Sequence, residues 1–273
     1  MRHSKSWYAL QREATFAAES MASGISILRK ADHYHTAHYL QAFFRLATGL
    51  ERSGKLALCL DNLRETNEFP SNTTLTKYKH NLSLLLSDLN AIGCGLSQPV
   101  YLPSSVVHKN IITILSDFAN NITRYHYLDV VTRPVNELRS YDPIARWFTD
   151  VTVPLIEDNL SLHKKQRLVY EAGLIDDLLD YITLTRYVTE ALNSIETIGG
   201  SHLHAQLIDH ARPYVRVYTM QICRFVAAMI LSIENEIPYA HREHIPVMTE
   251  IFQIFLVEDA YIRRRKTWSI YIS

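Results

Sequence analysis

Glycine is scarce in this chain, with eight glycines among 273 residues. Hairpin-rich folds need residues at positive φ in their turns, and glycine adopts that conformation with the least strain. Helices have no such need, and glycine weakens their interiors. Because 47% of the residues are hydrophobic, a chain of this length can also bury a large core. The composition therefore predicts a folded, all-α protein.

Apolar residues recur at helical spacing through the first half. In about residues 6–30 they step by three or four positions, at Leu10, Ala14, Ala17, Met21, Ile25 and Leu28. The same period predicts a long helix over about 34–63, one that restarts at Leu82 after a polar loop, and one that ends near Asn121. Ser104 or Ser105 is the expected N-cap of the last of these. The pattern indicates a multi-helix bundle.

The second half is predicted to be helical as well. Asp142 and Pro143 are typical of an N-cap followed by a first helical residue, and Pro154 is expected to kink or divide the helix that follows. Further helical patterns cover about 161–197, 201–235 and 241–262. A soft boundary falls near 132–142, so we expect a bundle in residues 1–132 and either a helical extension or a second helical subdomain in residues 133–273.

Charge and cysteine content indicate where such a chain resides. The chain has 28 basic and 28 acidic residues, so any polyanion site must be a local patch. Cys59, Cys94 and Cys223 are odd in number and lack metal-type spacing, which favours a reducing compartment. There is no signal-peptide pattern, and no stretch approaches the roughly 20 apolar residues of a bilayer span. We expect a cytoplasmic protein with no membrane association.

Several short motifs resemble the HEPN family of helical domains over about residues 34–130. They are the run Ala-Phe-Phe-Arg-Leu-Ala-Thr-Gly-Leu-Glu-Arg at 42–52, Lys-Leu-Ala-Leu at 55–58, Lys-His-Asn-Leu at 79–82 and the pair Arg124-Tyr125. The motifs follow the family's order, with a polar loop between two long helices. The resemblance implies an up-down antiparallel core to which the C-terminal helices are added.

The resemblance also implies a function. Many HEPN proteins are metal-independent endoribonucleases of stress or phage defence that act as homodimers, with an arginine and a histidine four to six residues later. Here Arg124 is followed by His126 after a single residue, and such neighbours project about 200° apart on a helix. An irregular backbone would let Arg124 hold a phosphate and His126 exchange protons, with Tyr125 binding nucleic acid. The alternative is an Arg124–Asp129 ion pair with a structural role.

Four consecutive cations near the C-terminus form a second candidate site. Arg263, Arg264, Arg265 and Lys266 are flanked by Tyr261, Trp268 and Tyr271, a mixture suited to phosphate contact and base stacking. Cations also stabilise the C-terminal end of a helix, which is the structural alternative.

Three clusters contain residues that bind metals in other proteins: His33, His35 and His38; His202, His204 and His210; and the acidic group around Asp176 and Asp180. None reproduces a recognised metal-binding spacing. We expect these side chains to be solvated or in the core, and we expect neither a metal nor another cofactor.

Two functional hypotheses follow. Glycine-rich phosphate loops, Gly-x-Ser-x-Gly elbows, Cys-x-x-Cys pairs and Rossmann fingerprints are absent, which argues against P-loop nucleotide hydrolysis, α/β-hydrolase chemistry and dinucleotide redox enzymes. The first hypothesis is an HEPN-like homodimer that binds or cleaves RNA. The second is a non-catalytic interaction or scaffold protein that dimerises or binds a protein partner, because the arginine-to-histidine spacing of the nuclease motif is missing.

Overall fold

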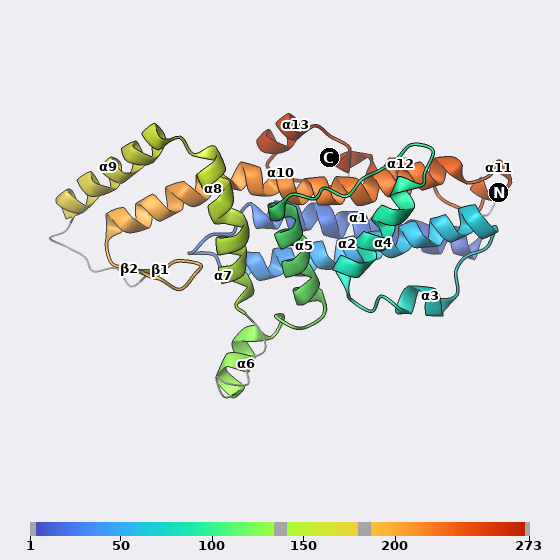
Figure 1. Ribbon diagram of the computed structural model, residues 1–273, viewed down its shortest axis with the longest axis horizontal. Helices are drawn as coiled ribbons and strands as arrows, with labels where there is room; N and C mark the ends of the chain where they lie inside the picture. Colours follow the sequence, from blue (N-terminus) through green and yellow to red (C-terminus); the bar gives the residue numbers. More distant parts are fainter. Residues whose placement is uncertain (1–3, 134–140, 180–186, 271–273) are drawn as a thin grey trace.

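The computed structural model describes residues 4–133, 141–179 and 187–270. Three long helices lie side by side along its length: α1 (Lys5–Leu28), α2 (Ala37–Thr66) and α10 (Ile198–Glu236) (Figure 1). Shorter helices cover this group, so the prediction of an all-α, multi-helix protein is confirmed. Ser4 begins α1 as an N-cap that accepts a hydrogen bond from the Trp7 amide.

The antiparallel helices α1 and α2 pack backbone to backbone. A Cβ atom at Gly49 would lie 2.6 Å from Met21 Cγ and 2.7 Å from the Met21 nitrogen, and one at Gly24 would lie 2.7 Å from Leu46 Cγ. Both helices also carry alanines with no exposed surface, namely Ala14, Ala17, Ala18, Ala22 and Ala42. The two long helices therefore approach as closely as their backbones allow.

Six further helices cover this group. They are α4 (Leu82–Cys94), α5 (Val106–Ala119), α7 (Pro143–Trp147), α8 (Val153–Asn159), α12 (Met248–Phe252) and α13 (Asp259–Arg264). A π-helical turn over Phe148–Thr152 joins α7 to α8, and a 3-10 turn over Gln253–Phe255 follows α12. Asp142 caps α7 with Pro143 in its first turn, and Ser105 caps α5, as the sequence predicts.

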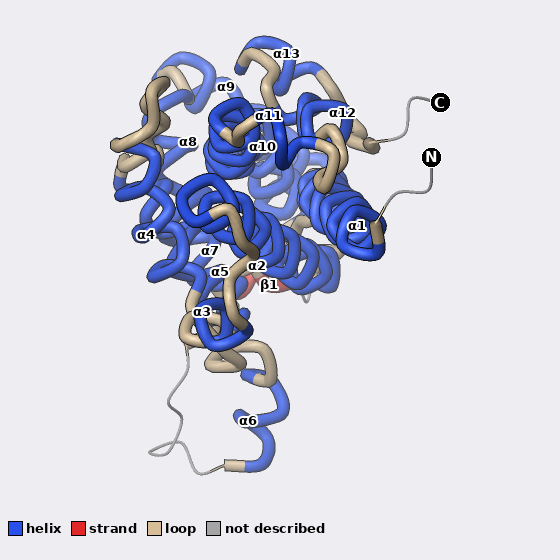
Figure 2. Tube along the Cα trace, turned by 90° about the vertical axis from the view of Figure 1, so that its right-hand side faces the viewer, coloured by secondary structure: helices blue, strands red, loops and turns tan. Residues whose placement is uncertain are grey.

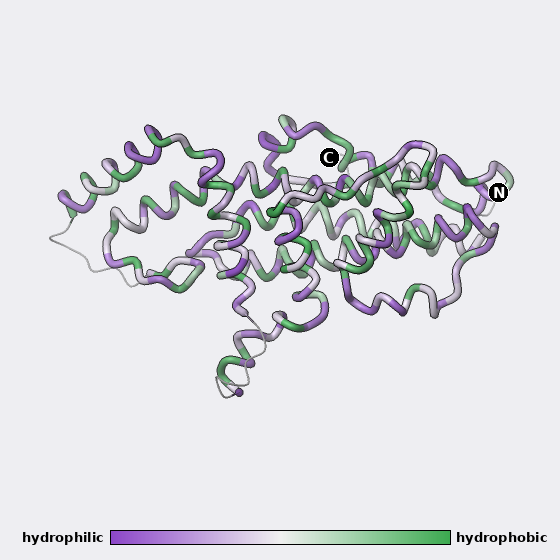
Figure 3. Tube along the Cα trace, viewed as in Figure 1, coloured by the Kyte–Doolittle hydropathy of each residue, from purple (hydrophilic) through white to green (hydrophobic). Residues whose placement is uncertain are grey.

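Three short helices and one longer helix lie at the edges of the molecule. They are α3 (Asn72–Thr76), α11 (Tyr239–Arg242), α6 (His126–Thr132) and α9 (Leu162–Leu179). Helix α6 projects away from the bundle, as both views show, and α9 lies along the N-terminal part of α10 (Figures 1 and 2). Hydrophobic residues run through the central helices and also occur on α6 and α9 (Figure 3).

One hydrophobic core connects both halves of the chain. It includes Phe43 and Leu46 of α2 together with Trp147, Phe252 and Phe255 from beyond residue 133. The Phe43 and Trp147 rings lie 4.9 Å apart, centroid to centroid. The core thus passes across the boundary that the sequence suggests near residues 132–142.

The structure corrects the helix predicted over 161–197. Helix α9 covers Leu162–Leu179 and residues 180–186 lie outside the described ranges, but residues 187–195 form a two-stranded antiparallel hairpin, with β1 (Tyr187–Val188) paired to β2 (Ser194–Ile195). The Gly199-Gly200 pair does not separate helices but lies in the first turn of α10. A Cβ atom at Gly199 would lie 2.1 Å from the Ala172 carbonyl oxygen, so glycine there permits the close contact of α10 with α9.

The helix predicted over 241–262 is also wrong. The chain forms α11, α12, a 3-10 turn and α13 in its place, with extended residues between them. The Glu234 carboxylate accepts a hydrogen bond from the Met248 amide, and the Arg224 guanidinium binds the Asp259 carboxylate. Such contacts with α10 fix the separate short helices, whereas local periodicity alone favours one continuous helix.

Helix α10 is long and apolar enough to cross a membrane, contrary to the expectation that no such stretch exists. Its most apolar 18-residue window has a mean hydropathy of 1.3, and 67% of that window is buried inside the protein. Packing against α2, α9 and α13 thus covers most of this apolar surface.

Replacement of Gly49 by alanine tests the backbone contact of α1 with α2. The new methyl group would collide with Met21 and push the two helices apart, so we expect a loss of about 1–3 kcal/mol in the free energy of unfolding. Gly173→Ala is the matched control, because a Cβ atom there meets nothing within 4 Å. It should raise stability slightly, by up to about 1 kcal/mol, through helix propensity. Urea unfolding of both variants measures the difference, and equal stabilities would contradict the close packing.

Candidate functional site on the exposed face of α2

A histidine held by a glutamate lies on the outer face of α2. The Glu51 Oε2 atom is 3.1 Å from His80 Nδ1, and Glu51 Oε1 accepts a hydrogen bond of 2.7 Å from Lys55 Nζ. The Glu51 side chain is mostly buried, whereas 60% of the His80 side chain is exposed. A carboxylate on Nδ1 fixes the ring's orientation and leaves Nε2 toward solvent, an arrangement that suits proton transfer.

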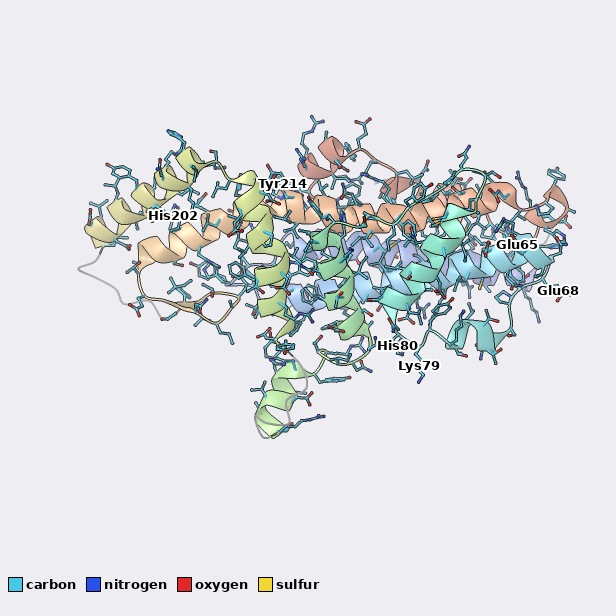
Figure 4. All side chains as sticks on the ribbon, viewed as in Figure 1. Glu65, Glu68, Lys79, His80, His202 and Tyr214 are labelled. Carbon is cyan, nitrogen blue, oxygen red and sulfur yellow. The ribbon has the colours of Figure 1, made fainter. Side chains whose placement is uncertain are left out.

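The loop before α4 places His80 in this position. Lys79 has a left-handed backbone with φ of 48°, which is uncommon for a residue with a side chain. Its carbonyl oxygen accepts a hydrogen bond of 2.9 Å from Lys55 Nζ, and Asn81 then caps α4 by accepting from the Leu84 amide. Figure 4 shows Lys79 and His80 at the lower edge of the bundle, where the chain passes from α3 to α4.

Arg124 lies against the same helix. Its guanidinium carbon is 4.8 Å from the centre of the Phe44 ring and 5.7 Å from that of Phe118, and Nη1 donates to Asn121 Oδ1. Phe44 precedes Glu51 by two helical turns, roughly 10 Å along α2, so both project from the same face. The structure thus brings Arg124 and His80 to one surface, which we call the α2 face: Phe44, Glu51, Lys55, His80 and Arg124.

The other two residues predicted beside Arg124 have different surroundings. His126 is buried at the start of α6, with its ring 5.3 Å from the Tyr127 ring, whereas the Tyr125 ring is exposed. Asp129 pairs with Arg133 at 3.1 Å, and the structure shows no Arg124–Asp129 ion pair. Arg124 is thus held by aromatic rings on α2 and α5.

The C-terminal cations lie on the surface beside α10. The Arg263 guanidinium is 5.3 Å from the Tyr214 ring centre, and the Arg265 guanidinium is 4.7 Å from that of Trp268. The carbonyl oxygens of Arg263 and Arg265 accept hydrogen bonds of 2.7 Å from the buried Arg216 guanidinium. Within the described ranges, Arg263, Arg264, Arg265 and Lys266 make no ion pair with a carboxylate, so this surface carries uncompensated positive charge. Figure 4 labels Tyr214 on the same stretch of α10.

One group in the described part of the chain combines metal-ligand residue types at short range. His33, Glu190 and His204 each offer a ligand atom, and these atoms lie within 4.8 Å of one another. Other residues of the three predicted clusters have different contacts. The Asp176 carboxylate accepts hydrogen bonds from the Gly199 amide and from the Thr197 hydroxyl at the start of α10, and the His35 ring stacks on that of His38. Asp180 lies outside the described residues.

A serine-histidine pair occurs at the start of α5, and its geometry indicates a structural role. Ser105 Oγ is 2.7 Å from His108 Nδ1, and His108 Nε2 is 2.7 Å from Gln221 Oε1. Burial lowers the pKa of His108, an effect that Gln221 and Asp259 partly oppose. Both ring nitrogens are engaged, with Nε2 toward α10, so the ring fastens the N-cap of α5 to the core.

Sequence reasoning did not single out Glu51 and Glu190 as site residues. The Glu51–His80 and Glu190–His204 contacts join segments whose pairing has no local signal in the sequence. The HEPN-like motifs did include Glu51, Lys55, His80 and Arg124, and all four lie on the α2 face.

Comparison of the chain with protein-family models, with curated proteins and with solved structures finds no match in any of the three. The resemblance to HEPN domains therefore stays a prediction that depends on the motifs quoted above.

Proposed function

We propose that the protein binds RNA on the α2 face and cleaves its phosphodiester backbone there without a metal ion. The observation that carries this proposal is the Glu51–His80 pair, an exposed imidazole oriented by a mostly buried carboxylate on the helix face that also holds Arg124. Proton transfer by a positioned imidazole and charge stabilisation by a guanidinium are the two contributions that such a reaction requires.

His80 acts as the base in this proposal. Its Nε2 atom takes the proton of a ribose 2′-hydroxyl, whose oxygen then bonds to the neighbouring phosphorus. The bond from phosphorus to the 5′-oxygen breaks, and that oxygen takes a proton from water, which leaves a 2′,3′-cyclic phosphate and a 5′-hydroxyl end. The hydroxide that remains takes the proton from the His80 imidazolium and so restores the base. The Glu51 carboxylate stabilises the imidazolium that forms.

Arg124 binds phosphate in this proposal. Its guanidinium rests on the partly exposed Phe44 ring, which orients the fork and leaves room for a base to stack beside it. The exposed Tyr125 ring and the uncompensated cations at 263–266 are proposed as further RNA contacts, with no part in the bond cleavage. Self-association of two copies, as in HEPN homodimers, belongs to the same proposal.

Substitution of His80 and Arg124 tests the α2 face directly. We expect purified protein to cleave a mixture of cellular RNA in the presence of EDTA. Because each group assists the transition state, His80→Asn and Arg124→Ala should each slow cleavage by about 100-fold or more. Gel analysis of the RNA gives the rates, and a test for cyclic phosphate ends identifies the chemistry.

Two control variants show whether a loss of RNA cleavage is specific to the α2 face. Arg52 also rests on an exposed aromatic ring, with its guanidinium 4.7 Å from the centre of Phe16, so Arg52→Ala controls for loss of such a contact. His163→Asn controls for loss of an exposed histidine on α9. Both should leave cleavage unchanged. Cleavage that survives in His80→Asn, or that EDTA abolishes while circular dichroism shows the protein still folded, would contradict the proposed site.

Helix α9 favours the second candidate function, a protein that acts by self-association. Its outer side exposes large apolar side chains at Leu162, Val169, Tyr170, Leu174 and Leu178, and 77% of Leu178 is accessible. These residues follow helical spacing on the side away from the buried Leu168 and Ala172. An apolar helix face of this kind suits packing against a second copy of the same helix.

Charged residues on the outer side of α9 test this second candidate. We expect the wild-type protein to sediment as a dimer, and the pair of changes Tyr170→Asp and Leu178→Asp to convert it to a monomer, because both side chains would otherwise be buried between the copies. Tyr239→Asp on α11, where the side chain is more exposed than either of these two, should leave the dimer intact. Identical sedimentation of all three proteins would remove α9 as the interface. A dimer without RNA cleavage would favour the interaction protein over the nuclease.

A further inference from the structure

The hairpin between α9 and α10 reverses the usual burial pattern. Three of its apolar residues, Tyr187, Val188 and Leu192, are exposed, the last of them to 67%, whereas Glu190 at its tip is only 2% exposed and is buried along with Ile195 of β2. Burial of a carboxylate is costly unless partners replace the lost water. Glu190 is therefore buried for its chemistry, since three apolar residues of the same hairpin remain exposed.

Both oxygens of Glu190 have partners from other segments. Glu190 Oε2 is 2.6 Å from His204 Nε2 on α10, and Oε1 accepts a hydrogen bond of 3.1 Å from the Tyr39 hydroxyl on α2. Burial and the nearby Glu190 carboxylate raise the pKa of Tyr39, so Tyr39 stays a neutral donor. One histidine and one tyrosine thus suffice for the hydrogen bonds of this carboxylate.

His33 is a second histidine close to Glu190, and the hydrogen bonds that Glu190 accepts from His204 and Tyr39 do not require it. His33 lies in the loop between α1 and α2, and its ring centre is 4.9 Å from that of His204 on α10. The Nδ1 atom is buried without a hydrogen-bond partner, and Nε2 is 3.5 Å from Ser201 Oγ, at the limit of a hydrogen bond. Burial, and next the nearby His204, lowers the pKa of His33.

We propose that His33, Glu190 and His204 bind one divalent transition-metal ion of the zinc class. Two imidazoles and one carboxylate are a ligand set of such ions, and their bonds of about 2.0–2.1 Å place tetrahedral ligand atoms roughly 3.3 Å apart. The three ligand atoms already lie within 4.8 Å of one another, so small side-chain rotations complete the geometry. Solvent or a bound molecule supplies the fourth ligand.

Neighbouring hydroxyl groups support the ligands from outside. Tyr39 holds the second oxygen of Glu190, and Ser201 contacts His33 while it also bonds to the Tyr34 hydroxyl. Hydrogen bonds of this kind orient metal ligands and increase their affinity. The sequence pattern groups His33 with His35 and His38, but the structure places His33 with residues of the hairpin and α10.

The ion would join three separate segments of the chain. The ligands come from the loop between α1 and α2, from the hairpin and from α10, so binding ties the hairpin to the long helices. Tyr39 precedes Glu51 by roughly 18 Å along α2, so this metal site is separate from the α2 face. It has a structural role that does not depend on the proposed RNA cleavage.

Titration of the full-length protein, freed of metal with EDTA and then of EDTA, tests the site. We expect calorimetry to show one Zn²⁺ bound per chain, Co²⁺ to give the intense visible absorption of a four-coordinate ion, and Zn²⁺ to raise the Tm. His33→Asn should weaken Zn²⁺ binding by more than about 10-fold, because loss of a residue that only hydrogen-bonds to a metal ligand can already cause a loss of that size. It should keep the fold, because His33 has no close hydrogen bond.

Two further variants complete this test. His204→Asn should also abolish tight binding, whereas His202→Asn, two positions earlier on the same helix, should bind as the wild type does. Circular dichroism of each metal-free variant verifies the fold. The proposal is overturned if the wild type takes up no Zn²⁺ and leaves the Co²⁺ spectrum that of the free aqueous ion, or if His33→Asn binds as tightly as the wild type.

Discussion

The contact between the backbones of α1 and α2 is the constraint on which the rest of the structure depends. Gly24 and Gly49 allow it, because a single methyl group at either position would overlap the facing helix. With the inner side of α2 fixed, Glu51 and Lys55 must face outward, and Tyr39 must reach the hairpin. Helix α10 then packs against the pair and supplies His204 at one end of the molecule.

Helical periodicity and capping residues predicted much of this fold. The apolar steps from Leu10 to Leu28 correspond to α1, and Ser105 and the Asp142–Pro143 pair begin helices as predicted. Prediction failed where tertiary contacts outweigh local propensity. Contacts with α10 divide the region 241–262, and the buried Glu190 joins the hairpin to Tyr39 and His204, a contact that periodicity cannot reveal.

The candidate site was predictable only in part. The HEPN-like motifs contain Glu51, His80 and Arg124, yet local spacing drew attention to Arg124 and His126. In the structure His126 begins the projecting helix α6, whereas Arg124 turns back onto Phe44. The Glu51–His80 contact links residues on either side of a loop, and the sequence contains no local signal for such a pairing.

The central claim is that Arg124 and His80 serve one RNA site on the α2 face. Nuclear magnetic resonance of the histidine side-chain nitrogens tests it most directly, in a titration with an oligoribonucleotide made uncleavable by 2′-O-methylation. We expect the His80 signals to shift on binding, the buried His108 signals to stay unchanged, and Arg124→Ala to weaken the RNA affinity measured through His80. RNA that binds while the His80 signals stay unchanged would contradict the central claim.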